Sequence, residues 1–333
     1  MTQKCFVLLL SAILLVMLGC SAPEVSSSSL SQSTEIPVLV SSSNQMQEEE
    51  PVLIQASDME EFGKLPDVLK VWENENMKSK IKVPNEDLLL YQFKYQVDAC
   101  EVLGSIVLPE DYLEKQYPLI IYNRGGNPNL SYDIEPMLCS LANGGFIAIG
   151  SRYRGSPGTK GEDEFGGSDV NDVLKIMEFV QQMSFVDPEQ VFMLGSSRGG
   201  MMTYLALRQD AENIVKAAVV TGGIADTVLN WEERGEDMKK VYRTYIGGSP
   251  EELPEEYAKR SAVNFADELN TPILIVHTKE DPRVSVNHAY RMRDALEAAG
   301  KEYELVIYDG NAHAVVGSET FEWFQKYGAV IPG

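Results

Sequence analysis

The pentapeptide Gly195–Gly199, Gly-Ser-Ser-Arg-Gly, matches the Gly-x-Ser-x-Gly pattern of a nucleophile elbow. The preceding residues 190–194 are mostly apolar and predict a buried strand, whereas residues 200–208 predict a helix. An elbow needs this context, because the strained turn between strand and helix lifts the serine hydroxyl clear of the sheet. We therefore expect Ser197 to be a nucleophile and the backbone N–H of Arg198 to stabilise an oxyanion. A glycine-rich turn without chemistry is the alternative.

A nucleophilic serine needs a base, and the base needs a carboxylate that orients it. The chain has three histidines. His288 lies in a segment that predicts a surface helix and is interpreted as a solvated residue, while His277 ends an apolar strand. His313 follows the strand predicted at 303–308 and a turn. It therefore lies on a loop at the carboxyl end of a strand, where open α/β sheets gather functional groups, and is the predicted base.

The predicted acid is Asp281, in a loop that directly follows an apolar strand. Glu280 next to it is the main competitor, and Asp309 is a weaker one because turn chemistry explains it more simply. An Asx turn is the non-catalytic interpretation of Asp281. With Ser197 before it and His313 after it, Asp281 completes the chain order of an α/β-hydrolase triad.

Other motifs occur in a fixed order along the chain. They are Tyr117–Tyr122, Gly125-Gly126, Ser151–Ser156, Gly166–Val173, Tyr257–Ala262, Thr271–His277 and Asp281–Val284. Together with the elbow and His313, these motifs make the region from about Tyr117 to Tyr327 resemble the catalytic domain of the prolyl oligopeptidase family of serine peptidases. The resemblance implies an α/β-hydrolase fold, peptidase activity, and a triad of the same serine, aspartate and histidine.

Two features depart from the family pattern. Many members have a His or Tyr before the Gly-Gly pair, where this chain has Arg124. The second oxyanion donor is therefore left open as a backbone N–H of Arg124 or Gly125, and the Arg124 side chain has the alternative role of a structural cation. Members also often have an N-terminal β-propeller, each blade of which takes about 40–45 residues. The stretch between Cys20 and Leu88 is too short for one, so we expect no propeller.

The elements that position these residues alternate between strand and helix. Residues 88–108 alternate apolar and polar and predict an antiparallel hairpin, after which apolar strands alternate with helical segments. This pattern predicts one α/β-hydrolase domain over 88–333, with a mostly parallel, doubly wound sheet. The segment 222–270 separates two predicted strands and is expected to form an inserted cap that shapes the substrate site. A solvated helical excursion without a role in recognition is the alternative.

The N-terminal residues resemble a targeting segment. Residues 1–19 predict a secretory signal peptide that is too short for a comfortable membrane span. Met17–Cys20 resembles a bacterial lipobox, which implies that Cys20 is lipidated and anchors the mature protein, with a cleaved secreted form as the alternative. Residues 20–51 are rich in Ser, Gln and Glu and predict a disordered tether, and residues 52–87 predict a helical lead-in.

Composition excludes several classes of function. The formal net charge of −22 argues against nucleic-acid binding and against electrostatic binding to a membrane, so a lipid anchor must supply any membrane contact. We find no metal-ligand spacing, phosphate loop or dinucleotide fingerprint, and we expect no cofactor and no metal. Whether Cys100 and Cys139 pair is left open, since two cysteines make no disulfide framework.

These observations predict an extracytoplasmic, membrane-anchored serine hydrolase that works through an acyl-enzyme. The resemblance favours a peptidase that acts on short peptides. A carboxylesterase on small esters is a close alternative because it uses the same triad. The third hypothesis is a catalytically silent lipoprotein that has the α/β-hydrolase fold but only binds a ligand.

Overall fold

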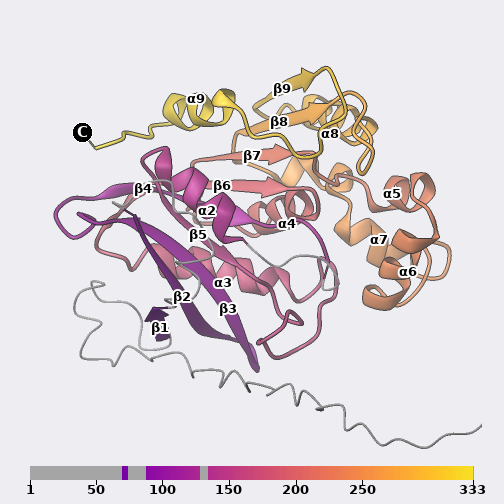
Figure 1. Ribbon diagram of the computed structural model, residues 1–333. Helices are drawn as coiled ribbons and strands as arrows, with labels where there is room; N and C mark the ends of the chain where they lie inside the picture. The colour runs from indigo at the N-terminus through magenta and orange to yellow at the C-terminus, as the bar shows by residue number, and fades with distance from the viewer. Residues whose placement is uncertain (1–69, 74–87, 128–133, 333) are drawn as a thin grey trace, which may run out of the picture. The chain divides into compact units, whose positions relative to one another are not determined.

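The computed structural model describes residues 70–73, 88–127 and 134–332. Within these residues, nine strands form one sheet in the order β1-β2-β3-β5-β4-β6-β7-β8-β9 (Figure 1). β1, β2, β3 and β5 pair antiparallel, and every pair from β5 through β4 to β9 is parallel. The predicted mostly parallel sheet is therefore confirmed. The strands are β1 (Lys70–Glu73), β2 (Leu88–Val97), β3 (Cys100–Pro109), β4 (Tyr117–Asn123), β5 (Ile147–Ser151), β6 (Val186–Ser196), β7 (Ala217–Thr221), β8 (Ile273–Thr278) and β9 (Tyr303–Tyr308).

Helices cover both faces of the sheet. Side chains of α3, α4 and α8 pack with one set of strand residues, for example Ile121, Met193 and Val220, and those of α2 and α9 pack with the alternate set, for example Leu194 and Val219. This alternation follows from the two-residue period of a strand, and it produces two apolar layers. The helices are α2 (Glu135–Asn143), α3 (Val170–Val180), α4 (Arg198–Leu207), α8 (Asn287–Ala298) and α9 (Ser318–Lys326).

The N-terminal hairpin is formed by β2 and β3, as predicted, with Phe93, Tyr95 and Val97 buried on one face. The helix predicted within 52–87 is wrong for residues 70–73, which form β1 and pair antiparallel with β2. Backbone pairing with an open sheet edge outweighs local helix propensity there. The rest of that segment, the predicted signal peptide, the tether and Cys20 lie outside the described residues.

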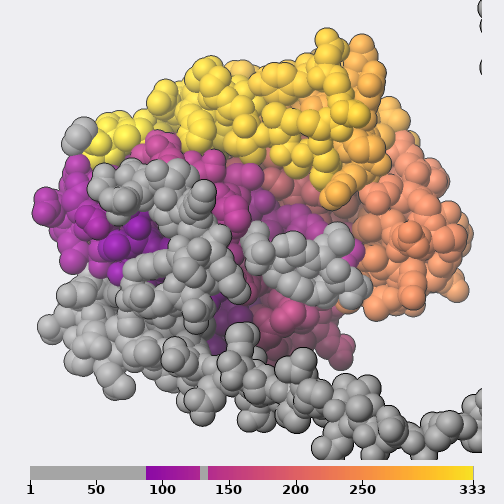
Figure 2. All heavy atoms as spheres, in the orientation of Figure 1, coloured from indigo at the N-terminus to yellow at the C-terminus, as the bar shows by residue number. Residues whose placement is uncertain are grey.

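The segment 222–270 contains the helices α5 (Thr227–Glu233), α6 (Glu236–Tyr245) and α7 (Pro254–Arg260), and the short turns η2 (Ala262–Asn264) and η3 (Ala266–Glu268). The three helices lie beyond the carboxyl ends of the parallel strands, at the right in Figure 1. In Figure 2 their residues, coloured orange, form one block at that end of the molecule. The cap is thus a compact helical insertion at the edge of the sheet where Ser197 lies.

The cap has its own aromatic core. Trp231, Tyr242 and Tyr257 are buried against one another, with ring centroids 5.7–6.2 Å apart. Phe165, in the loop before α3, packs on Tyr242 with 5.2 Å between the ring centroids. Such contacts stabilise an insertion against the domain from which it emerges. In the part of the chain that the structure describes, no helix is both long and apolar enough to cross a membrane.

Candidate active site

Ser197 occupies a strained turn between β6 and α4. Its φ of 57° and ψ of −120° are rare for a residue with a side chain. The turn is possible because its neighbours are small: a Cβ atom on Gly199 would lie 1.8 Å from the carbonyl oxygen of Asn123, and one on Gly195 would lie 2.3 Å from the carbonyl oxygen of Gly199. The predicted strand–turn–helix context of the elbow is confirmed.

Two backbone N–H groups are candidates for binding an oxyanion beside Ser197. Arg198 is the first residue of α4, so its N–H has no acceptor within the helix. Gly125 packs directly on the serine, since a Cβ at Gly125 would lie 3.0 Å from Ser197 Cβ and 3.7 Å from Ser197 Oγ. The loop after β4 therefore passes next to the hydroxyl, as an oxyanion-binding loop must.

The side chain of Arg124 has a structural position. It is buried, its Nε and Nη2 donate to the carbonyl of Arg152 at 3.1 and 2.7 Å, and Nη1 donates to the carbonyl of Gly125 at 3.0 Å. Its guanidinium also lies 4.7 Å from the ring centroid of Tyr153. These contacts match the alternative role stated for the side chain, and the backbone N–H of Arg124 or Gly125 stays the predicted second donor.

Asp281 and His313 meet at the carboxyl ends of β8 and β9. His313 Nδ1 lies 2.7 Å from Asp281 Oδ2, while Asp281 Oδ1 accepts the N–H groups of Arg283 and Val284 at 2.8 and 3.1 Å. Burial opposes ionisation of Asp281, but the hydrogen bonds from His313 and the two N–H groups outweigh it and hold its pKa below the usual value. The ionised carboxylate thus fixes one tautomer of His313, with Nε2 free to accept a proton.

The two alternative acids, Glu280 and Asp309, do not contact His313. Glu280 and Asp309 are both exposed, and Asp309 lies 3.9 Å from Lys279. His277 is buried in β8, and its Nε2 lies 2.8 Å from the carbonyl oxygen of Val284, so this nitrogen carries a proton and donates it. The arrangement brings His313 to Asp281 and to neither alternative acid.

His288 was expected to be solvated, and this prediction is wrong. Its side chain is completely buried at the start of α8, and its Nδ1 accepts the N–H groups of Ala225 and Asp226 at 3.2 and 3.3 Å. Burial lowers the pKa of His288 to about 4. The neutral ring therefore joins α8 to the first turn of the cap, a contact across more than sixty residues that helical periodicity does not reveal.

The Ser197 and His313 loops are linked through the end of β7. The N–H of Ser197 donates to the carbonyl of Thr221 at 3.0 Å. A Cβ at the next residue, Gly222, would lie 2.9 Å from the N of Ala314 and 3.2 Å from Asp281 Oδ2. Gly222 also has a φ of +53°, so the close approach of these three loops requires glycine there.

Sequence reasoning missed the side chain of Arg198, which it considered only for its backbone N–H. The guanidinium is buried and binds Asp163 and Asp169, with Nη–Oδ distances of 2.5–2.9 Å. It also stacks on Phe165, with 4.6 Å between the guanidinium carbon and the ring centroid. The sequence offers only a weak signal for this cluster, namely two aspartates in the glycine-containing stretch 161–169.

Among the described residues, no group of histidine, cysteine, aspartate and glutamate side chains could hold a metal ion, and Cys100 and Cys139 are free thiols. A hydroxyl on a strained turn, two N–H groups beside it and a carboxylate-bound imidazole nearby are the parts required for acyl transfer.

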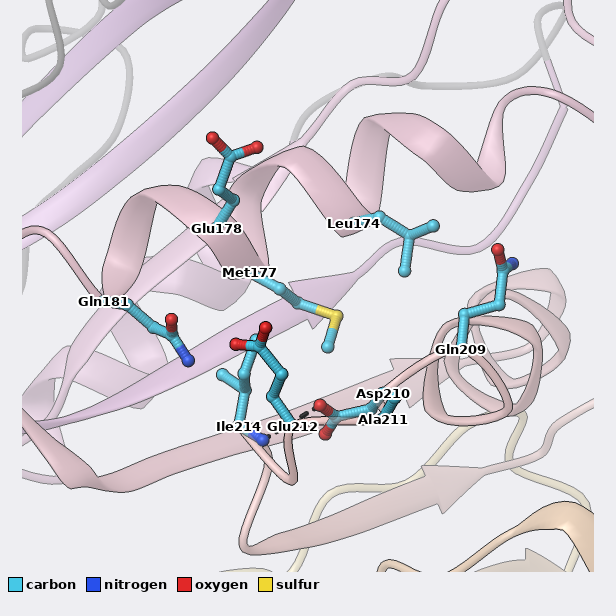
Figure 3. A pocket seen from close by; sticks show the side chains of 9 residues that line it. All are labelled: Leu174, Met177, Glu178, Gln181, Gln209, Asp210, Ala211, Glu212 and Ile214. Carbon is cyan, nitrogen blue, oxygen red and sulfur yellow. Dashed lines mark hydrogen bonds between the residues drawn. The ribbon is translucent and has the colours of Figure 1, made fainter.

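A separate hollow of about 320 Å³ lies between α3 and the loop after α4 (Figure 3). This loop leads to the amino end of β7, the opposite sheet edge from Ser197. Two of its acidic groups have partners, since Asp210 accepts the N–H groups of Ile214 and Val215 and Glu178 binds Lys175. The hollow is therefore no part of this site.

The chain is similar in sequence to known peptidases. The chain is 29% identical over 237 residues to an uncharacterized peptidase, YtmA, of Bacillus subtilis, covering 71% of this chain and 90% of that protein. It is 26% identical over 242 residues to a dipeptidyl-peptidase 5 of Porphyromonas endodontalis, covering 68% of this chain but only 34% of that protein. The chain thus spans nearly all of one relative and about a third of the other.

Solved structures share the fold. The acylaminoacyl peptidase of Pyrococcus horikoshii superposes with a TM-score of 0.60 at 22% identity, covering 78% of this chain and 46% of that one. A puromycin-hydrolyzing peptidase of Mycobacterium tuberculosis gives a TM-score of 0.63 at 22% identity, covering 76% and 42%. The predicted α/β-hydrolase fold is confirmed. Residues 132–328 match the family described as the prolyl oligopeptidase family, and the chain therefore belongs to that family and is a serine-type peptidase.

Proposed function

We propose that this peptidase cleaves short peptides through an acyl-enzyme on Ser197, with His313 as base and Asp281 as the group that orients it. The 2.7 Å contact between His313 Nδ1 and Asp281 Oδ2 is the observation that most supports the proposal. It leaves Nε2 of His313 available to accept the serine proton. The His313 loop packs against Gly222, and the preceding residue, Thr221, accepts the N–H of Ser197.

In the first step, Ser197 Oγ attacks the carbonyl carbon of the scissile amide while His313 Nε2 takes the hydroxyl proton. The new C–O bond produces an oxyanion, which accepts hydrogen bonds from the N–H groups of Arg198 and Gly125. When the C–N bond breaks, the amine leaves with the proton from His313. Asp281 stabilises the imidazolium between these transfers.

In the second step, water attacks the acyl carbon. His313 accepts a proton from the water, the C–O bond to Ser197 breaks, and the serine regains its proton as the acid leaves. No group other than the three side chains and the two N–H donors is required. The cap formed by residues 222–270 lies at this edge of the sheet, and we propose that it limits the size of the substrate.

A fluorophosphonate probe tests the nucleophile. It should label the full chain at Ser197, and Ser197→Ala should abolish labelling and reduce kcat by about 10⁶-fold, with His313→Ala nearly as damaging. Undiminished labelling of Ser197→Ala would contradict the assignment of the elbow. An inactive His277→Ala beside an active His313→Ala would make His277 the base.

The substrate class is tested with kcat/KM for matched short peptide amides and short-chain esters. Both bonds are expected to break, because activated esters need little leaving-group protonation, whereas amide cleavage requires His313 as an acid. Amide cleavage that depends on the peptide sequence supports the peptidase. Ester turnover with every amide inert would favour the carboxylesterase, and absence of both would leave a binding protein.

We also propose an extracytoplasmic location through lipid on Cys20. The Met17–Cys20 sequence at the end of an apolar segment supports this proposal. Metabolic labelling with a fatty acid should mark the wild-type chain in the membrane fraction, and Cys20→Ser should remain unlabelled. Equal labelling of both, or of neither, would exclude a lipid on Cys20.

A further inference from the structure

His313 lies on a loop without regular structure, residues 309–317, between β9 and α9. The loop starts at β9, the edge strand of the sheet, yet it must bring His313 to Ser197, which lies at the end of β6. It therefore crosses the carboxyl ends of β8 and β7. Because catalysis is sensitive to displacements of about 1 Å, something has to fix this crossing.

Two threonine hydroxyls bind the loop on either side of His313. Thr278, the last residue of β8, donates to the carbonyl of Ala312, and Thr221, the last residue of β7, donates to the carbonyl of Val315. Both threonines are buried, with 3% and 0% of their surface exposed. The two strands are parallel neighbours, so their ends provide two anchor points along the path of the loop.

Thr221 contacts both halves of the proposed catalytic group. Its carbonyl accepts the N–H of Ser197 at 3.0 Å, while its hydroxyl binds the His313 loop. One residue thus sets the position of the elbow and of the loop relative to the same strand end. Ala314, which follows His313 between the two anchored carbonyls, has a φ of 56°, so the backbone beside His313 is held in a conformation that few side-chain-bearing residues adopt.

We propose that Thr221 and Thr278 are positioning residues that hold His313 in reach of Ser197, an inference that rests on the proposed function. Neither side chain takes part in the bond-making and bond-breaking steps proposed above. Valine has nearly the same shape as threonine but cannot donate, so Thr→Val would leave a carbonyl of the loop without its partner. Serine keeps the hydroxyl and loses only a methyl group.

The test compares Thr221→Val and Thr278→Val with Thr221→Ser and Thr278→Ser in steady-state cleavage of the best amide found for the wild-type chain. We expect each valine variant to lower kcat at least about 10-fold with KM changed less than about 3-fold, and each serine variant to retain most of kcat. Serine keeps the hydroxyl donor, so its recovery of kcat would assign the loss in the valine variants to the missing hydrogen bond.

Thr159→Val is the matched control. The Thr159 hydroxyl also donates to a backbone carbonyl, that of Ser156 at 2.6 Å, in a loop outside the proposed catalytic group. Its variant should keep wild-type kcat. Valine variants at 221 and 278 that are folded and as active as Thr159→Val would overturn the inference.

Hydrogen exchange adds a readout that does not depend on turnover. The peptide covering 309–317 should exchange faster in the valine variants and at the wild-type rate in the serine variants. If a valine variant does not fold, the serine variant at that position decides. Slow exchange of the 309–317 peptide together with wild-type kcat supports the inference. Fast exchange and a reduced kcat in a folded serine variant contradict it. Failure of the wild-type chain to label at Ser197 would instead refute the proposed function.

Discussion

The guanidinium of Arg198 forms a two-pronged ion pair with Asp163, with Nη1–Oδ2 and Nη2–Oδ1 distances of 2.7 and 2.9 Å. Both side chains are nearly inaccessible to solvent, and Nη2 also binds Asp169. Arg198 directly follows Ser197, so the pair ties the start of α4 to the loop before α3. Arg260 of α7 donates to the carbonyl of Phe165 in the same loop at 3.2 Å, which extends the connection to the cap.

Asp163→Asn should destabilise the protein strongly. The variant loses the charge-assisted hydrogen bonds between Asp163 and the Arg198 guanidinium in a buried site, while Asp169 remains as a carboxylate partner of Arg198. We expect a loss of about 2–3 kcal/mol of unfolding free energy. The control is Glu268→Gln, which breaks the two-pronged but exposed pair with Arg208 and should cost less than about 1 kcal/mol. Urea denaturation measures both values, and equal costs would contradict the role given to burial.

Gly199→Ala should prevent formation of the elbow. Its Cβ would lie 1.8 Å from the carbonyl oxygen of Asn123, a backbone atom that cannot move aside without shifting β4. We expect no fluorophosphonate labelling and little folded protein. Gly235→Ala is the control, because no atom lies within 4 Å of its added Cβ and its φ is −70°. Labelling of Gly199→Ala at the wild-type rate would contradict the prediction.

Asp281→Asn should lower kcat by about 10⁴-fold with little change in fold. An amide in place of the carboxylate no longer selects the tautomer with a proton on His313 Nδ1 or stabilises the imidazolium, and loss of this carboxylate has that effect in Ser-His-Asp triads. Glu280→Gln and Asp309→Asn change the two exposed competing acids and should remain active. Amide hydrolysis by the three variants decides which carboxylate orients His313.

The buried His288 should make the protein less stable in mild acid. Burial lowers its pKa from 6.5 to about 4, despite the Glu233 carboxylate 4.0 Å away. Between these two pH values the unfolded chain binds a proton that the folded chain does not, so the free energy of unfolding falls as the pH falls from 6.5 to 4. The loss is on the order of 3 kcal/mol. Urea denaturation at pH 7.5 and pH 5 measures the first part of this loss.

His288→Asn is the comparison for that measurement. An asparagine oxygen can accept the N–H groups of Ala225 and Asp226 but does not titrate, so the stability of the variant should change less with pH than that of the wild-type chain. His277, whose pKa burial also lowers, remains in both proteins and cancels in the difference. Parallel pH profiles would show that His288 is not the source.

The sequence by itself determined the features that depend on local pattern. The elbow is one such feature. It comprises the strand before Ser197, the glycines around the serine and the helix after it, all within twenty residues. Only small residues fit beside the serine in this turn, so the local sequence predicts it. The order of Ser197, Asp281 and His313, each after an apolar strand, predicted that all three lie at one sheet edge, because parallel strands end on the same side. The structure brings two of these side chains into contact and the loops of all three together.

Only the tertiary structure decided contacts between distant segments. The burial of His288, the Arg198–Asp163 pair and the threonine hydroxyls that bind the His313 loop join residues tens of positions apart. Such contacts depend on the order of the strands in the sheet and on where the loops cross them. The periodicity of apolar residues predicts helices and strands, but it predicts neither the strand order nor the path of a loop. For the same reason β1 was expected to be helical: residues 70–73 form a strand because β2 offers them backbone partners.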